Sequence, residues 1–199
     1  MEIDGATPFR FDLESEGSIS ILADAWREDP PGLVIVATGV LTLADGTGPE
    51  RTLRSLDAET MEAVFRINTI GPAMIARHML PLMPRDRRSV FAALSARVGS
   101  LRDNRLGGWH SYRASKAALN MLIRNFAIEM GRTHKDSVIV GLHPGTVDTR
   151  LSEPFQGNVP EGQLHSPGEA AEHLLQVIAS LKPADSGNVL DWKGRIVPD

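Results

Sequence analysis

The sequence predicts an α/β fold in which helices cover a mostly parallel β-sheet. Three stretches, residues 33–40, 89–95 and 137–142, are almost unbroken apolar runs, which is typical of strands buried on both faces. Two longer segments, residues 57–79 and 112–131, carry apolar residues at helical spacing. Because strands and helices alternate along the chain, the helices are expected to connect parallel strands.

Weaker patterns predict the remaining elements. An alternation of polar and apolar residues predicts a strand over residues 8–13 that ends near Asp12. A helical pattern that a proline pair ends predicts a helix over 15–28, and a capping box with proline at the first helical position predicts a helix over 166–181. A final strand is expected over 188–192. Within the segment 57–79, Asp57 is the expected N-cap, and Pro72 is expected to kink the helix.

Length and composition limit the classes of protein to which the chain can belong. A length of 199 residues predicts one domain spanning residues 1–199. The net charge of −4, from 21 basic and 25 acidic residues, argues against a nucleic-acid or anionic-membrane partner. The lack of cysteine excludes disulfides and cysteine-based chemistry, and the six histidines show no ligand spacing, so no metal site is expected. No apolar run reaches about 18 residues and no signal-peptide pattern opens the chain, so we expect a cytoplasmic protein.

The stretch from residue 111 to residue 120 contains the pair of residues that points to chemistry. Tyr112 and Lys116 are four residues apart on a predicted helix, so their side chains share one face. A nearby ammonium favours the charged form of a phenol, and we expect Lys116 to lower the pKa of Tyr112 toward neutrality. A tyrosine tuned in this way exchanges a proton with a carbonyl or alcohol oxygen. In isolation, the same pair is also typical of an exposed helix face.

Together with three further segments, this stretch resembles the classical short-chain dehydrogenase/reductase family. The residues Tyr-Arg-Ala-Ser-Lys-Ala-Ala-Leu-Asn from position 112 are similar to the C-factor-like branch of that family. Asn68, Ser95 and the segment Pro144-Gly145-Thr146-Val147-Asp148-Thr149 match further family motifs in the same order along the chain. The resemblance runs from about residue 8 to the end of the chain, and it implies a Rossmann-like doubly wound parallel sheet.

The resemblance also implies a role for each matching residue. Tyr112 would be the general acid/base, and Lys116 would bind the nicotinamide ribose and lower the Tyr112 pKa. Ser95 would hydrogen-bond the substrate oxygen, and Asn68 would complete the proton relay.

The implied cofactor is NAD or NADP. Besides Lys116, the residues expected to contact it are Asp12 near the adenine, Gly39 beneath the cofactor, and Pro144, Gly145, Val147 and Thr149 around the nicotinamide. Most classical family members are dimers or tetramers, so the resemblance also implies a homo-oligomer formed through the helices at 57–79 and 112–131.

The largest departure from the family is at the N-terminus. The glycine-rich turn Thr-Gly-x-x-x-Gly-x-Gly, which receives the cofactor pyrophosphate, has no counterpart, because the one Gly-x-Gly, Gly46-Thr47-Gly48, follows the wrong strand. The chain matches the family from just before its third strand, so we expect an N-terminally truncated version of the fold. This leaves the strand at 33–40 with an unpaired edge, which residues 8–13, another chain or upstream residues could fill.

Two smaller departures affect the expected site. The family turn Asn-Asn-Ala-Gly is replaced by Val36-Ala37-Thr38-Gly39, so both amide side chains are lost. Counting back from Gly99 places Ala96, not Ser95, at the position of the family serine. Ser100 and Ser111 are the alternatives to Ser95 for this role.

Three functions are consistent with the sequence. The first is an NAD(P)-dependent oxidoreductase that acts on a small alcohol or carbonyl compound. The second is a non-catalytic protein that acts through protein contacts, since the C-factor-like branch is associated with cell–cell signalling. The third is a fragment that does not bind cofactor, as a wrongly assigned start codon would produce. Neither the substrate nor the choice between NAD and NADP follows from the sequence, because the selecting residue comes after the family's second strand.

Overall fold

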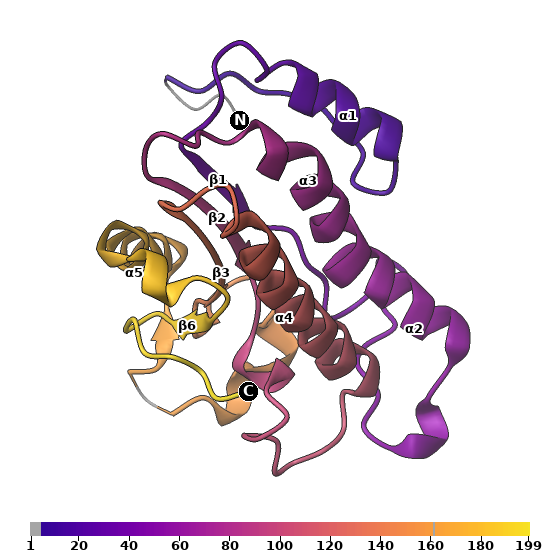
Figure 1. Ribbon diagram of the computed structural model, residues 1–199. Helices are drawn as coiled ribbons and strands as arrows, with labels where there is room; N and C mark the ends of the chain where they lie inside the picture. Colours follow the sequence, from indigo (N-terminus) through magenta and orange to yellow (C-terminus); the bar gives the residue numbers. More distant parts are fainter. Residues whose placement is uncertain (1–4, 161) are drawn as a thin grey trace.

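A parallel four-stranded sheet with helices on both faces forms the centre of the molecule (Figure 1). In a computed structural model that describes residues 5–160 and 162–199, the strands lie in the order β1–β2–β3–β6. All pairings between them are parallel, and the strands are β1 (Leu33–Val36), β2 (Ser89–Leu94), β3 (Ser137–His143) and β6 (Val189–Asp191). The predicted α/β fold around a parallel sheet is confirmed.

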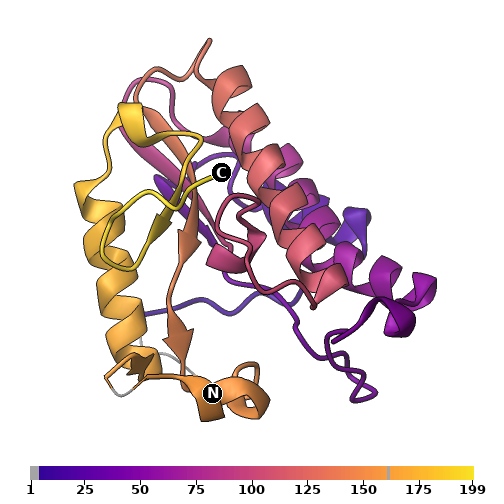
Figure 2. The same cartoon turned by 90° about the horizontal axis from the view of Figure 1, so that it is seen from below.

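Helices form one layer on each face of this sheet (Figure 2). Phe91 and Ile139 belong to the apolar cluster beneath α3 and α4, whereas Val90 and Val140 belong to the cluster beneath α5. Successive strand residues point to opposite faces, so each strand supplies both clusters. The helices are α1 (Glu16–Asp24), α2 (Ala58–Phe65), α3 (Gly71–Met79), α4 (His110–Met130) and α5 (Pro167–Ser180).

The helix predicted over residues 57–79 forms as α2 and α3, joined by a π-helical turn at Arg66–Ile70. The predicted N-cap is confirmed, because the Asp57 carboxylate accepts a backbone N–H of the first turn. Pro72 is the second residue of α3, separated from the π turn by Gly71 alone. Since proline has no N–H, it cannot donate the usual helical bond to the carbonyl of Asn68, which favours a wider turn at this point. The irregularity expected at Pro72 therefore takes the form of a π turn.

The strand predicted at residues 8–13 is wrong. Residues 8–12 have no regular secondary structure, and Phe11 and Leu13 pack against the apolar cluster beneath α3. The close fit is visible at Gly71, where a Cβ atom would lie 2.6 Å from Leu13 Cγ. Alternation of polar and apolar residues predicts which side chains are buried, but a strand also needs a hydrogen-bonding partner.

The strand predicted over residues 33–40 is shorter than expected and is buried on one face only. It ends at Val36, and β2 is its one partner among the described strands. Leu33 and Ile35 point to the α5 side of the sheet, in register with Val90 and Ala92, yet each is 41% exposed. The expected unpaired edge is therefore present in the described part of the chain, and an uncovered apolar face accompanies it.

The segment that follows His143 contains a small parallel pair of its own. β4 (Thr146–Val147) pairs with β5 (Leu164–His165), which folds the intervening segment back beside the sheet. The predicted capping box then starts α5, with reciprocal hydrogen bonds between Ser166 and Glu169. No helix within the described residues is both long and apolar enough to cross a membrane.

Candidate active site

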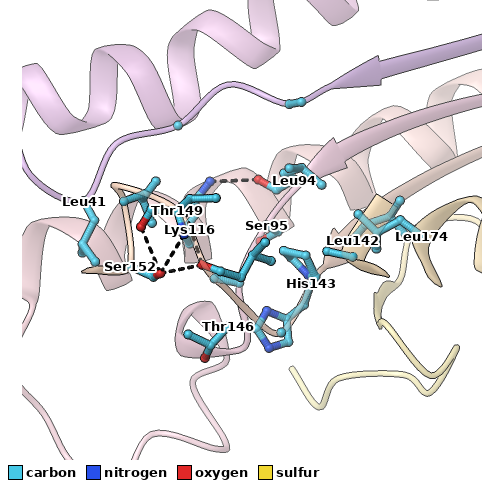
Figure 3. Close-up of a pocket in the computed structure, with 18 of the residues that line it drawn as sticks. Leu41, Leu94, Ser95, Lys116, Leu142, His143, Thr146, Thr149, Ser152 and Leu174 are labelled. Carbon is cyan, nitrogen blue, oxygen red and sulfur yellow. Dashed lines mark hydrogen bonds between the residues drawn. The ribbon is translucent and has the colours of Figure 1, made fainter. Parts of the chain in front are cut away.

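A cavity of about 700 Å³ opens where β1, β2 and β3 end (Figure 3). This is the edge of a doubly wound sheet where ligands usually bind, and the volume lies within the range typical of small-molecule sites. The segments that follow the three strands, the first turns of α4 and one side of α5 form its walls.

Tyr112 and Lys116 both line the cavity, as the sequence predicts. They lie one turn apart on α4, with Lys116 Nζ 5.9 Å from the centre of the Tyr112 ring. Lys116 Nζ also donates to the Leu94 carbonyl at 2.8 Å, which ties α4 to the end of β2. Only 9% of Tyr112 and 3% of Lys116 is exposed.

The expected pKa of Tyr112 is wrong in direction for this structure. Burial raises the pKa of Tyr112 to about 12 and lowers the pKa of Lys116 to about 8, because each charged form loses its hydration. The effect of burial exceeds that of the neighbouring ammonium on the phenol. Tyr112 is therefore neutral at physiological pH and is suited to donate a proton.

Asn68 lies in the π turn beneath the cavity rather than in its wall. Its amide side chain accepts the Val40 N–H at 2.8 Å and donates to the Val40 carbonyl at 2.9 Å and to Ser115 Oγ at 3.2 Å. These bonds fix the backbone beside Gly39, where a Cβ atom would lie 3.3 Å from Asn68 Oδ1 and 3.4 Å from Lys116 Nζ. The structure thus brings Asn68, Gly39 and Lys116 together.

Ser95 lines the cavity, but its hydroxyl is already engaged. Ser95 Oγ donates to Asn120 Oδ1 on α4 at 2.5 Å. The alternative Ser100 accepts the backbone N–H of Asp103, and the hydroxyl of Ser111 donates to a carboxylate; neither lines the cavity. Among the three serines, Ser95 is the one that reaches the cavity, where Ala96 lies beside it.

Most residues expected to contact the cofactor also meet at this cavity. Pro144, Gly145, Val147 and Thr149 line it, together with Gly39 and Lys116. Gly145 has a φ of +79°, and a Cβ atom there would lie 3.1 Å from both His165 Cδ2 and Trp192 Cδ1, so this turn requires glycine. Asp12 is not part of the cavity, because it is exposed in the turn that precedes α1.

Sequence reasoning missed one buried group near the site, Glu50. Its carboxylate accepts the Ser111 N–H at 3.1 Å and a short hydrogen bond from Ser111 Oγ, so it caps the N-terminal turn of α4. Burial opposes ionisation, yet these bonds and the charge of His110 hold the pKa of Glu50 below its usual value. Glu50 is 61 residues away from Ser111 in sequence, and no local pattern signals the contact.

The cavity fits one part of a nicotinamide dinucleotide and not another. The cavity has the volume for a flat ring and its ribose, and Lys116 lies beside Gly39 in its lining. Lys116 is the one charged side chain among the described lining residues, so a pyrophosphate would find neither a glycine-rich turn nor a second cation there. The nicotinamide and its ribose fit the described residues, and the pyrophosphate does not.

Residues 2–159 match the family model described as short chain dehydrogenase. The chain belongs to this family. It is 35% identical to C-signal of Myxococcus xanthus over 73% of this chain and 82% of that protein. It is also 36% identical to 1-hydroxy-2-glutathionyl-2-methyl-3-butene dehydrogenase of Rhodococcus sp. (strain AD45), over 88% of this chain and 73% of that protein.

A solved structure shows the same fold. An NADPH-bound carbonyl reductase from chicken fatty liver superposes with a TM-score of 0.80 at 26% identity, over 95% of this chain and 75% of that chain. The resemblance to short-chain dehydrogenases that the motifs indicate is confirmed, as is the Rossmann-like sheet. Membership of this oxidoreductase family accounts for the parallel sheet and for the cavity at its strand ends.

Proposed function

We propose that this short-chain dehydrogenase catalyses NAD(P)-dependent interconversion of a small, neutral alcohol and its carbonyl compound. The observation that carries the proposal is the meeting of Tyr112, Lys116, Gly39 and the turn at Gly145 around one cavity. These residues come from three separate segments of the chain. The simpler interpretation of the Tyr–Lys spacing is a pair on an exposed helix face. That interpretation does not account for the burial of Tyr112 and Lys116.

Tyr112 would act on the proton in this reaction. Its phenol is neutral at pH 7, so it donates to the oxygen of a carbonyl compound during reduction. In the reverse direction the phenol must first lose its proton, which makes alcohol oxidation faster as the pH rises. Lys116 is mostly protonated at pH 7 and stabilises the phenolate left after proton donation.

The cofactor, when bound, supplies or accepts the hydride. Lys116 and Gly39 would hold its ribose, and Pro144, Gly145, Val147 and Thr149 would hold the nicotinamide ring. Asn68 would act from below by fixing the backbone at Val40 and hence the position of Gly39. Ser95, the one of the three candidate serines that lines the cavity, would hydrogen-bond the substrate oxygen after its bond to Asn120 is exchanged.

The charge of the cavity wall narrows the substrate class. The Rhodococcus relative is named for a substrate with a glutathionyl group, which carries carboxylates. In the described lining of this chain Lys116 is the one cation, and the cofactor ribose would occupy it. We therefore expect a neutral substrate here.

Titration of NADH and NADPH into the purified protein tests the proposal most directly. Saturable binding that raises the free energy of unfolding by about 2.7 kcal/mol at one hundred times the dissociation constant is the expected result. Gly39→Val should abolish it, because the new side chain would meet Asn68 and Lys116, whereas Gly17→Val, at a position with open space, should not. No binding of either cofactor at millimolar concentration would overturn the proposal.

A second candidate function rests on two observations. The chain is 35% identical to C-signal, and the described residues supply no pyrophosphate site. A role in signalling through protein contacts would need neither turnover nor cofactor. Tyr112→Phe separates the two functions, because it should abolish an enzymatic effect and leave a contact-based effect intact.

A further inference from the structure

The backbone at Trp109 is strained. Its φ is +52°, and it is the one non-glycine residue with a positive φ in the part of the chain that the structure describes. Left-handed geometry is unfavourable for a bulky side chain, and it persists where surrounding contacts impose it, which is common at functional sites. Trp109 lies three residues before Tyr112 and lines the same cavity.

Several hydrogen bonds hold Trp109 in this conformation. The Glu50 carbonyl accepts the Trp109 N–H at 2.5 Å, while the carboxylate of Glu50 caps the helix that begins at the next residue. The guanidinium of Arg113 donates to the carbonyls of Gly108 at 3.1 Å and Val98 at 3.3 Å. The backbone on both sides of the strained residue is therefore fixed.

The Trp109 ring forms an aromatic wall with two other rings. It meets the Phe155 ring edge-on, with centroids 4.9 Å apart at 64°, and the Tyr112 ring with centroids 6.3 Å apart at 74°. Phe155 comes from the segment between β4 and β5, and all three residues line the cavity. An aromatic surface thus lies directly beside the phenol that would exchange the proton.

We propose that the adjoining rings of Trp109 and Phe155, called the aromatic clamp below, form a contact surface that selects substrates with an aromatic ring next to the reacting carbon. Aryl ketones and aryl carbinols are such substrates. Rings of this kind gain from edge-on or offset contact with aromatic side chains beyond the burial of apolar area. The proposal rests on the proposed function. The reaction is then an aryl ketone plus a hydride from the reduced nicotinamide and a proton from Tyr112. It gives the aryl carbinol, the oxidised nicotinamide and a Tyr112 phenolate, which regains its proton from solvent.

The test compares two ketones of matched size, acetophenone and cyclohexyl methyl ketone. The ratio of their kcat/KM values should favour acetophenone in the wild type, and Phe155→Leu and Trp109→Leu should each reduce this ratio about three- to tenfold. Trp109→Phe keeps a ring and should retain most of the preference. Trp26→Leu, on an exposed side chain outside the cavity lining, is the matched control and should leave the ratio unchanged.

A binding measurement makes the clamp testable without turnover. In protein labelled with 5-fluorotryptophan, the ¹⁹F resonance of Trp109 should shift on addition of acetophenone more than on addition of cyclohexyl methyl ketone, while that of Trp26 should not move. Phe155→Leu, which leaves the backbone at Trp109 untouched, keeps this measurement meaningful if Trp109→Leu fails to fold.

The outcomes separate the clamp from the proposed function. Turnover of both ketones with an unchanged ratio in the Phe155 and Trp109 variants overturns the clamp and leaves the oxidoreductase function standing. Selective binding of acetophenone without turnover supports the clamp and overturns the function. An equal shift of the Trp109 resonance with both ketones overturns the clamp, because the role of Trp109 is then limited to packing of the loop.

Discussion

The end of the cavity that holds Tyr112 and the end that lies under α5 are held together by different forces. Near Tyr112, buried hydrogen bonds join distant segments: Asn68 to Val40, Thr69 Oγ1 to the Ser115 carbonyl at 2.8 Å, and Lys116 to Leu94. Under α5 the lining is apolar, and Leu33 and Ile35 of the adjoining β1 are partly exposed.

Directional bonds specify one geometry, whereas apolar contacts specify mainly that a surface is covered. The difference indicates that the proton-transfer groups are preorganised by the described residues themselves. The α5 end sets few constraints on what covers it.

The largest effect is expected at the hydrogen-bonded end. Tyr112→Phe should lower kcat by about 10²- to 10⁴-fold, the usual contribution of an acid/base group. Tyr112 Oη makes no hydrogen bond within the described residues, so the free energy of unfolding should change by less than about 1 kcal/mol. Steady-state kinetics and urea denaturation measure the two quantities, and activity close to that of the wild type would contradict the proposed role.

Two isoleucines of the same sheet measure the contrast in packing. Ile139 on β3 is 1% exposed, so Ile139→Ala should cost about 2–5 kcal/mol in unfolding free energy. Ile35→Ala on β1 removes a side chain that is already partly in water and should cost less than about 1 kcal/mol. Similar losses from urea denaturation of both variants would show that β1 is covered in solution.

The pH dependence of stability reports on Lys116. Its pKa is about 8 in the folded protein, below the usual 10.5 that applies to the unfolded chain. Between these values the unfolded chain binds more protons, so stability should rise with pH, by roughly 3 kcal/mol in total. Denaturation of the wild type and Lys116→Met at pH 8 to pH 10 measures this slope, which the variant should lack. A wild-type slope equal to that of the variant would show that the ammonium is well hydrated.

The smallest of these effects is expected at the π turn. Asn68→Ala leaves the N–H and carbonyl of Val40 without their partner, and we expect a loss of about 2 kcal/mol in unfolding free energy. Asn68→Asp keeps an acceptor for the Val40 N–H, and its loss of unfolding free energy relative to the wild type should be smaller at pH 5 than at pH 8. At the lower pH more of the carboxyl is protonated and can also donate to the Val40 carbonyl. Equal stability of the two variants at both pH values would argue against this local role.

Long periodic segments made much of the fold predictable. The helices at 57–79 and 112–131 and the strands at 89–95 and 137–142 each bury a regular series of apolar side chains, so composition and spacing suffice. The expected strand at 8–13 failed because pairing depends on a neighbour that the local sequence does not encode. The small pair β4–β5 was missed for the same reason, since each strand has two residues.

The site was predictable where it follows motifs. The family resemblance alone predicted as site residues Tyr112, Lys116 and the segment from Pro144 to Thr149, and these residues line the cavity except Asp148. The pKa of Tyr112 and the cap from Glu50 depend on burial and on contacts across the fold, which no short motif contains. Assembly through the helices at 57–79 and 112–131 stays a prediction.

The π turn at Arg66–Ile70 has a consequence for how the gene can change. A π turn is an α-helix with one residue inserted, so shortening this segment by one codon would restore a regular helix. Each residue advances a regular α-helix by about 100°, and the wider π turn absorbs the extra residue, so α2 and α3 would keep their present faces after the deletion. The change would fall on the turn itself, where Asn68 holds both backbone groups of Val40. The helix that looks most ordinary in the sequence therefore contains one residue more than its packing requires, at the point where it supports the site.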